Sequence, residues 1–205
     1  MGEDKKEHWE RVYHTNNPDQ VSWTQAVPQT SLNFIRGFDL AKTDRIIDVG
    51  GGDSKLVDFL LQEGYTNITV LDISEAALAK AKVRLGEKSS LVTWIFCDVT
   101  TFEPTETYTL WHDRAAFHFL TTQDQITSYL NIAAKAISDY LVIGTFSENG
   151  PEKCSGLAIK QYTEQELQTV FDEHFEKVSC ITEDHTTPFA TKQNFLFCSF
   201  KKRKV

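Results

Sequence analysis

The stretch Arg45-Ile46-Ile47-Asp48-Val49-Gly50-Gly51-Gly52-Asp53-Ser54 decides the fold of this 205-residue chain. Its β-branched run predicts a buried strand over residues 45–49, and the apolar spacing of residues 54–62 predicts a helix. The glycines between them let ligand atoms approach the backbone closely. A strand, a glycine loop and a helix in this order indicate the start of a βαβ unit.

Strands and helices continue to alternate along the chain. We expect further strands at residues 67–71, 92–96, 109–112 and 140–145, and helices at residues 75–85 and 123–137. Such alternation predicts an α/β, Rossmann-like, mostly parallel sheet with helices on both faces. The chain then ends differently: a capping box at residues 163–166 opens one more helix, and strands at 175–182 and 194–201 predict a C-terminal antiparallel hairpin.

The length fits a single domain over residues 1–205. Within it we expect an N-terminal helical lid segment at residues 1–44, with a helix at 31–38. Residues 45–146 are expected to form the cofactor-binding core, and residues 147–205 the acceptor loops and the hairpin.

Composition excludes several classes of protein. A net charge of −8 disfavours a dedicated nucleic-acid binder, whose surface is usually basic. No apolar run approaches the ~18 residues that a membrane helix needs, and the charged N-terminus is unlike a signal peptide. The four cysteines show no metal-ligand spacing, so we expect no metal site and reduced, mostly buried thiols in a cytoplasmic protein.

Acidic residues end three successive strands. Asp72 follows Gly50 by 22 positions, the place from which a carboxylate binds ribose hydroxyls in dinucleotide folds. Asp98 is placed to accept from an adenine amino group while Val99 packs on the ring. Asp48 is expected near a cationic amino group. Together these residues predict an adenosine-containing cofactor.

Two such cofactors compete, a nicotinamide dinucleotide and S-adenosylmethionine. In the dinucleotide fingerprint the third glycine position falls here on Lys55, whose side chain would obstruct close packing of helix and strand. Asp48 would also lie unfavourably near an anionic pyrophosphate. The sequence therefore favours S-adenosylmethionine and keeps an NAD-dependent oxidoreductase as the weaker alternative.

The series Asp48-x-Gly50-x-Gly52, Asp72 and Asp98-Val99 resembles the motifs of class I S-adenosylmethionine-dependent methyltransferases. The resemblance implies a seven-stranded sheet with one antiparallel strand and S-adenosylhomocysteine as product. Ser54 stands where this family often has a third glycine. On this resemblance the cofactor-binding residues are Trp23, Asp48, Gly50, Gly52, Asp72, Ile73, Asp98, Val99 and Asp113.

Shorter matches suggest a subgroup. Residues 111–117, Trp-His-Asp-Arg-Ala-Ala-Phe, are similar to a Trp-Asp-Arg-Gly-Ala-Leu stretch of thiopurine-methyltransferase-like proteins, with His112 inserted. Residues 7–13, 22–23 and 52–54 resemble the methyltransferase-like group that includes lysine methyltransferases of elongation factor and citrate synthase. These matches do not fix a substrate.

Asp113, His112 and His118 are candidate catalytic groups. Each has a structural alternative: an ion pair between Asp113 and Arg114, or a histidine packed in the core. Trp23 either covers the donor pocket or anchors the N-terminal segment, and Asp53 either lies at the site or caps the following helix. The general base therefore stays open.

The expected activity is methyl transfer to an unidentified small-molecule or protein side-chain acceptor. We expect the loops at 147–156 and 184–193 to frame the acceptor pocket, with Lys153, Tyr162, His185 and Gln193 as lining candidates. A non-catalytic S-adenosylmethionine-binding module is the alternative. We expect neither a nucleic acid nor a membrane as partner, and the oligomeric state is not predicted.

Overall fold

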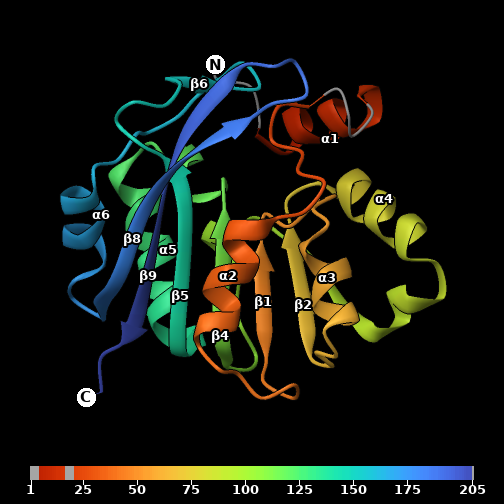
Figure 1. Ribbon diagram of the computed structural model, residues 1–205, viewed down its shortest axis with the longest axis horizontal. Helices are drawn as coiled ribbons and strands as arrows, with labels where there is room; N and C mark the ends of the chain where they lie inside the picture. Colours follow the sequence, from red (N-terminus) through yellow and green to blue (C-terminus); the bar gives the residue numbers. More distant parts are fainter. Residues whose placement is uncertain (1–4, 17–20, 205) are drawn as a thin grey trace.

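The computed structural model describes residues 5–16 and 21–204 and contains a seven-stranded sheet with helices on both faces (Figure 1). The strand order is β3-β2-β1-β4-β5-β9-β8, in which β9 runs antiparallel to both of its neighbours. The strands are β1 (Ile46–Val49), β2 (Ile68–Asp72), β3 (Val92–Phe96), β4 (Tyr108–Arg114), β5 (Ile137–Phe146), β8 (Phe175–Thr186) and β9 (Lys192–Lys202). A separate antiparallel pair joins β6 (Lys153–Cys154) and β7 (Leu157–Ala158). The predicted α/β fold with a C-terminal hairpin is confirmed.

The helices are α1 (Lys5–Thr15), α2 (Gln29–Gly37), α3 (Leu56–Gln62), α4 (Glu75–Leu85), α5 (Gln123–Ala136) and α6 (Glu164–Phe171), with short 3-10 helices η2 (Gly86–Leu91), η3 (Val99–Thr101) and η4 (Phe117–Phe119). Helices α3, α4 and α5 occupy the places that the alternation predicts, and α1 and α2 lie in the N-terminal segment that precedes it. In Figure 1, α1 lies beyond the carboxyl ends of β1 and β2, where it is placed to cover a ligand. Residues 1–4 and 17–20 of the predicted lid segment lie outside the described residues.

Local signals set most helix starts. Ser74 caps α4 by accepting a hydrogen bond from the Ala77 amide, and Thr163 and Glu166 form the predicted capping box of α6. Helix α3 begins later than expected, at Leu56, because the Ser54 hydroxyl accepts from the Leu56 amide in a turn that precedes the helix. The predicted loop at 147–156 is also partly ordered, since β6 lies within it.

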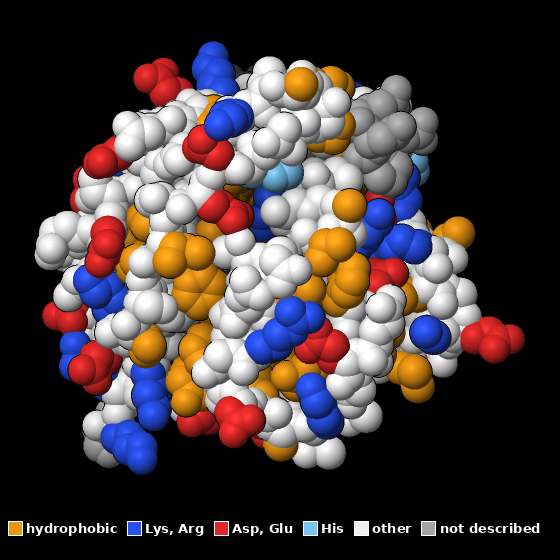
Figure 2. Space-filling model, viewed as in Figure 1, with side chains coloured by type: hydrophobic (Ala, Val, Ile, Leu, Met, Phe, Trp, Pro, Cys, Tyr) orange, Lys and Arg blue, Asp and Glu red, His pale blue; other side chains and the backbone are white. Residues whose placement is uncertain are grey.

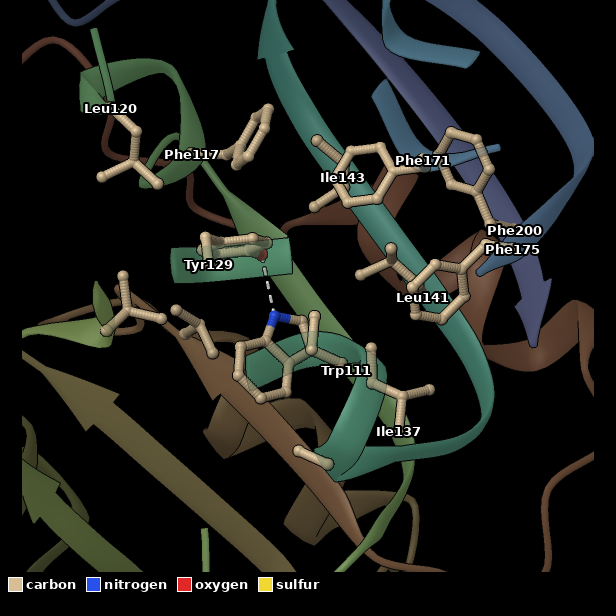
Figure 3. Packing of buried hydrophobic residues seen from close by; sticks show 14 of the residues in the cluster. Trp111, Phe117, Leu120, Tyr129, Ile137, Leu141, Ile143, Phe171, Phe175 and Phe200 are labelled. Atoms are coloured by element: carbon tan, nitrogen blue, oxygen red, sulfur yellow. Dashed lines mark hydrogen bonds between the residues drawn. The ribbon is translucent and has the colours of Figure 1, made fainter. Parts of the chain in front are cut away.

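Two apolar layers hold the helices on the sheet. On one face, the α5 and α6 side chains pack against β4 and β5, and the Trp111 indole donates a 2.9 Å hydrogen bond to the Tyr129 hydroxyl (Figure 3). On the other face, Leu32 and Ile35 of α2 join apolar residues of α3 and β1. Burial of such side chains is the main force that stabilises the fold.

The cysteine prediction is wrong for one pair. Cys180 of β8 and Cys198 of β9 are opposite one another in the hairpin, with their Cα atoms 4.1 Å apart, and they form a disulfide. Cys97 and Cys154 are free thiols, as expected. Sequence spacing could not show the pairing, because the register of the hairpin alone brings the two residues together.

The surface carries charges of both signs. In Figure 2, Lys and Arg side chains are interspersed with Asp and Glu over the viewed face rather than separated by sign. Within residues 5–16 and 21–204, no helix combines the length and apolar character that a bilayer span requires.

Candidate functional site

A cavity lies where the carboxyl ends of β1, β2 and β3 meet. Parallel pairing sets Val49 beside Leu71, and Leu71 beside Ile95, so the residues that follow these strands reach one edge of the sheet. The cavity has about 800 Å³ of empty space, part of it open to solvent. It is lined by the predicted cofactor residues Trp23, Gly50, Asp72, Ile73, Asp98 and Val99. The structure thus brings most of the predicted site together.

Asp72 is the most perturbed carboxylate of this cavity. Its side chain is buried, and Oδ1 accepts a 2.8 Å hydrogen bond from the Ser74 amide. Burial raises the pKa of Asp72 to about 7, although hydrogen bonds from the backbone of Ser74 and Gly52 oppose the shift. A buried carboxylate with this pKa gains from hydroxyl donors supplied by a ligand, because they stabilise its charged form.

The glycine loop leaves no room for side chains. Gly50 has φ +65°, and a Cβ there would lie 2.6 Å from the Ala116 Cβ. Gly52 has φ +41°, and a Cβ there would lie 2.8 Å from Asp72 Oδ2. The Gly50 amide donates to the Leu71 carbonyl at 2.8 Å, which ties the loop to the end of β2. Positive φ and close contacts together require glycine at both positions.

Asp53 follows the glycine loop but does not cap a helix. Its carboxylate pairs with Arg84 of α4, whose guanidinium also binds Asp58. Burial raises the pKa of Asp53, while Arg84 opposes the shift. The residue therefore fastens the loop to α4.

Asp98 and Val99 follow β3 as predicted. Asp98 Oδ1 accepts from the Thr100 amide at 2.8 Å and from the Thr100 hydroxyl at 2.7 Å, which caps η3. The hydrogen bonds described for this side chain involve Oδ1, so Oδ2 is available to a ligand. Val99 is buried beside it and offers an apolar surface.

A second hollow adjoins the first and contains Asp48 and His112. The two hollows share Tyr13, Trp23, Gly50 and Arg114. Asp48 Oδ1 lies 2.7 Å from His112 Nδ1, and His112 Nε2 lies 2.8 Å from the Ser31 hydroxyl. Because a carboxylate only accepts, His112 donates from Nδ1. Asp48 Oδ2 is buried and has no partner among the described residues, so it can receive a cationic group.

The other catalytic candidates lie away from the lining of these hollows. Asp113 is fully buried: Oδ1 accepts from the Ala116 and Phe117 amides, and Oδ2 from the Tyr129 hydroxyl. Burial raises the pKa of Asp113 to about 6. His118 is also buried, and burial lowers its pKa to about 3, so it is neutral at physiological pH.

The ion pair between Asp113 and Arg114, which the sequence left open as an alternative to a catalytic role, is not formed among the described contacts. Asp113 is bonded to the turn after β4, whereas Arg114 Nη1 donates a 3.0 Å hydrogen bond to the Trp23 carbonyl. Arg114 thereby connects β4 to the segment that carries Trp23. This contact gives Trp23 both a lining role and an anchoring role.

The residues predicted to line the acceptor pocket lie outside the two hollows. His185 Nε2 lies 2.7 Å from the Ser22 carbonyl, and Gln193 Nε2 donates to the Ser22 hydroxyl at 3.3 Å. Tyr162 is buried in the core, and Lys153 is exposed. These four side chains are absent from the lining of both hollows. Within residues 184–193, β8 continues to Thr186 and β9 begins at Lys192, so the connecting segment is confined to residues 187–191.

Several lining residues escaped the sequence analysis. Trp9 of α1 packs edge-on against Trp23 and Phe119, with ring centroids 5.6 and 5.1 Å apart. Glu10 of α1 accepts hydrogen bonds from the first amides of α4, which holds this helix over the site. The four-residue spacing of Trp9 and Tyr13 signalled a shared helix face, but nothing in the sequence pointed to Cys154, which lines the first cavity.

Comparisons with known proteins agree with this geometry. Residues 46–138 match a family model described as a methyltransferase domain. The N-methyltransferase NodS of Bradyrhizobium japonicum WM9, in complex with S-adenosyl-L-homocysteine, has a TM-score of 0.74 at 15% identity, over 98% of this chain and 100% of that chain. A search of the curated proteins found no match.

Two further solved structures share the fold. A methyltransferase of Anabaena variabilis ATCC 29413, described as dependent on S-adenosylmethionine, has a TM-score of 0.77 at 13% identity, over 98% of this chain and 96% of that chain. The 1,6-didemethyltoxoflavin-N1-methyltransferase of Burkholderia thailandensis has a TM-score of 0.69 at 18% identity, over 98% of this chain and 84% of that chain.

These findings support the class predicted from the sequence. Residues 46–138 are similar to a methyltransferase domain, and the chain shares its fold with the solved methyltransferase structures. The ligand in the NodS structure, S-adenosyl-L-homocysteine, is the product expected from the predicted cofactor. The likeness to thiopurine-methyltransferase-like proteins stays a prediction.

Proposed function

We propose that this chain binds S-adenosylmethionine in the first cavity and transfers its methyl group to a small-molecule or protein side-chain acceptor. The observation that carries the proposal is the convergence of Asp72, Asp98 and the glycine loop on one cavity at the ends of three adjacent strands. Ligands bind at this edge in open α/β sheets.

Each part of the cofactor has a matching group. Asp72 is placed to accept from the ribose hydroxyls, and Asp98 from the adenine amino group. Ile73 and Val99 supply apolar contacts to the ring. The unpartnered Asp48 Oδ2 in the adjoining hollow fits the methionine ammonium group. Gly50 and Gly52 keep the backbone within reach.

Methyl transfer requires mainly that the protein positions the acceptor correctly. The sulfonium supplies an electrophilic methyl group, so the protein has to position the acceptor in line with it and limit water. Trp9, Trp23 and Phe119 form an aromatic cover suited to that task. His112, oriented by Asp48, is the catalytic candidate that lines a hollow, and we retain it as the base for acceptors that carry a proton.

Asp113 acts through the backbone in this scheme. Its hydrogen bonds to Ala116 and Phe117 shape the turn against which Gly50 packs, so it is a positioning residue. We keep the division into a covering segment (1–44), a cofactor-binding core (45–146) and an acceptor-side segment (147–205).

Calorimetric titration tests the binding step. We expect S-adenosylmethionine and S-adenosylhomocysteine to bind the wild-type chain and NAD not to bind. Binding of NAD alone would instead favour an oxidoreductase. Release of S-adenosylhomocysteine with a panel of small carboxylates, thiols, amines and whole-cell protein then separates an enzyme from a non-catalytic binding module.

A further inference from the structure

Arg114 lies at the site and has a hydrogen-bonding edge without a partner among the described residues. It ends β4 and lines both hollows. Nη1 donates to the Trp23 carbonyl, and the guanidinium carbon lies 4.8 Å from the centroid of the Phe195 ring. Nε and Nη2 are buried and have no partner among the described residues. These two nitrogens form one edge of the planar group, which can bind both oxygens of a carboxylate.

Other arginines of the chain show what this edge binds when it is occupied. Arg84 Nε and Nη2 both donate to the Asp58 carboxylate, at 3.2 and 2.9 Å. Arg36 uses the same two nitrogens on Glu63 Oε1, at 3.1 and 2.5 Å. In Arg114 the equivalent edge is buried and empty. Since a buried charge is costly without a partner, a ligand is the natural source of one.

The acids nearest to Arg114 do not hydrogen-bond to it: Glu183 and Asp48 each keep one buried oxygen, Oε1 and Oδ2, without a partner among the described residues. Glu183 and Asp48 both raise the pKa of Arg114, but burial outweighs them and lowers it to about 10, so the side chain is cationic at neutral pH. Glu183 accepts from the Thr30 hydroxyl, and Asp48 Oδ1 is bonded to His112. Neither carboxylate bonds to Arg114 among the described contacts.

Some of the residues that line the first cavity with Arg114 are apolar. Cys154, Trp23 and Phe119 line the first cavity together with Arg114. The acids among the described lining residues of this cavity are Asp72 and Asp98, which follow β2 and β3. Arg114 thus offers a cation next to apolar lining residues, in a cavity that Lys5 also lines.

We propose that the free edge of Arg114 binds a ligand carboxylate, and that the acceptor is a small apolar carboxylic acid rather than a lysine side chain. The inference rests on the proposed function. An ammonium acceptor would meet both the sulfonium and the unpaired guanidinium, which repel it, whereas an anion is attracted by both. The carboxylate of the cofactor's own methionine part shares this chemistry, so the experiment has to separate the two sources.

The test titrates ligands onto the wild type, Arg114→Gln and Arg114→Lys. Arg36→Gln is the matched control, because it removes an equal charge from an edge that Glu63 already occupies. The ligands are S-adenosylhomocysteine, 5′-methylthioadenosine (which lacks the amino-acid part), and benzoate or benzamide added to protein saturated with S-adenosylhomocysteine. Circular dichroism and thermal unfolding verify that each variant is folded.

We expect benzoate to bind the saturated wild type better than benzamide. We expect Arg114→Gln to weaken benzoate binding by about tenfold or more, and to weaken S-adenosylhomocysteine binding no more than 5′-methylthioadenosine binding. Arg114→Lys, which keeps the charge and loses the fork, is expected to give an intermediate affinity.

Other outcomes decide against parts of the proposal. If Arg114→Gln weakens S-adenosylhomocysteine but not 5′-methylthioadenosine, the carboxylate is the cofactor's and the acceptor assignment is overturned. If wild type binds benzoate no better than benzamide and Arg114→Gln alters no affinity, carboxylate binding by Arg114 is overturned. Failure of the wild type to bind S-adenosylhomocysteine refutes the proposed function instead.

Discussion

The two sides of the candidate site differ in how they are built. On the β1–β3 side, each lining group follows its strand directly in the chain, and backbone amides orient the carboxylates of Asp72 and Asp98. On the β4–β5 side, the lining comes from segments far apart in the sequence: Trp9 of α1, Arg114 of β4 and Cys154 of β6. The first side is local in sequence, and the second is assembled by tertiary contacts.

This difference suggests a division of labour. The β1–β3 side has the invariant geometry that a nucleoside requires, with glycines at positive φ and acids at strand ends. The β4–β5 side has the Arg114 cation next to apolar lining residues, and its shape depends on how the hairpin and the N-terminal segment pack. Changes to one side should therefore be separable from changes to the other.

Removal of the disulfide between Cys180 and Cys198 should have the largest effect, and it tests whether the two sides of the site can be changed separately. Cys180 and Cys198 close a loop with a sequence separation of 18, and loss of such a cross-link costs about 3 kcal/mol of stability in the chain-entropy model. We expect that loss in urea unfolding of a Cys198→Ser variant, with the Kd of S-adenosylhomocysteine within about twofold of wild type, since distant sites are nearly additive. Cys97→Ser, which removes a free thiol, is the control. A large fall in cofactor affinity would contradict the separation.

The Asp72→Asn substitution should affect the β1–β3 side of the site. The variant keeps the shape but loses a charged acceptor for the ribose hydroxyls, so binding should weaken by roughly 30- to 100-fold, or about 2–3 kcal/mol. Calorimetry with S-adenosylhomocysteine measures the change. Asp172→Asn, which removes an exposed ion-paired carboxylate, should have no effect. If the Asp72→Asn variant binds S-adenosylhomocysteine as well as wild type does, the nucleoside does not bind at the end of β2.

The pH dependence of binding should follow Asp72. Its pKa of about 7 in the unliganded protein means that the carboxylate is largely protonated in mild acid. Because ribose hydroxyls stabilise the charged form, affinity should rise by up to about tenfold per pH unit below pH 7 and level off above it. Asp72→Asn should flatten this profile. If wild type and Asp72→Asn show the same pH dependence of binding, a group other than Asp72 causes it.

The raised pKa also affects stability. A group whose pKa is higher in the folded than in the unfolded chain contributes stability below its unfolded value, near 3.8, that is lost as pH rises through about 7. Unliganded protein should therefore lose stability over this window, and Asp72→Asn should lose less of it. Thermal unfolding across this pH range measures the difference.

Tyr129→Phe should give the smallest effect. The Tyr129 hydroxyl accepts from the Trp111 indole and donates to Asp113, so its removal leaves buried polar groups unpaired and should cost about 1–2 kcal/mol. Chemical denaturation measures this cost, and Tyr140→Phe, which alters a partly buried tyrosine, serves as control. Cofactor affinity should be retained, because the backbone amides of Ala116 and Phe117 still hold Asp113.

Much of this site could be predicted because its signals are local. Asp72 and Asp98 lie within a few residues of the strands that position them, so a correct strand assignment also placed the carboxylates. The capping box at Thr163 depends on residues three apart, and it was predicted correctly. The acceptor candidates Tyr162, His185 and Gln193 could not be placed in this way, because their contacts join distant segments.

By itself the sequence determined the order of strands and helices, the glycine loop and the acids at the cofactor edge, since hydrophobic periodicity and strand-end chemistry act over short stretches. Only the tertiary structure decided that Cys180 pairs with Cys198, that Asp113 accepts hydrogen bonds from backbone amides, and that two nitrogens of Arg114 have no partner among the described residues. These outcomes depend on strand register and on packing between segments far apart in the chain, and no short stretch of residues encodes them.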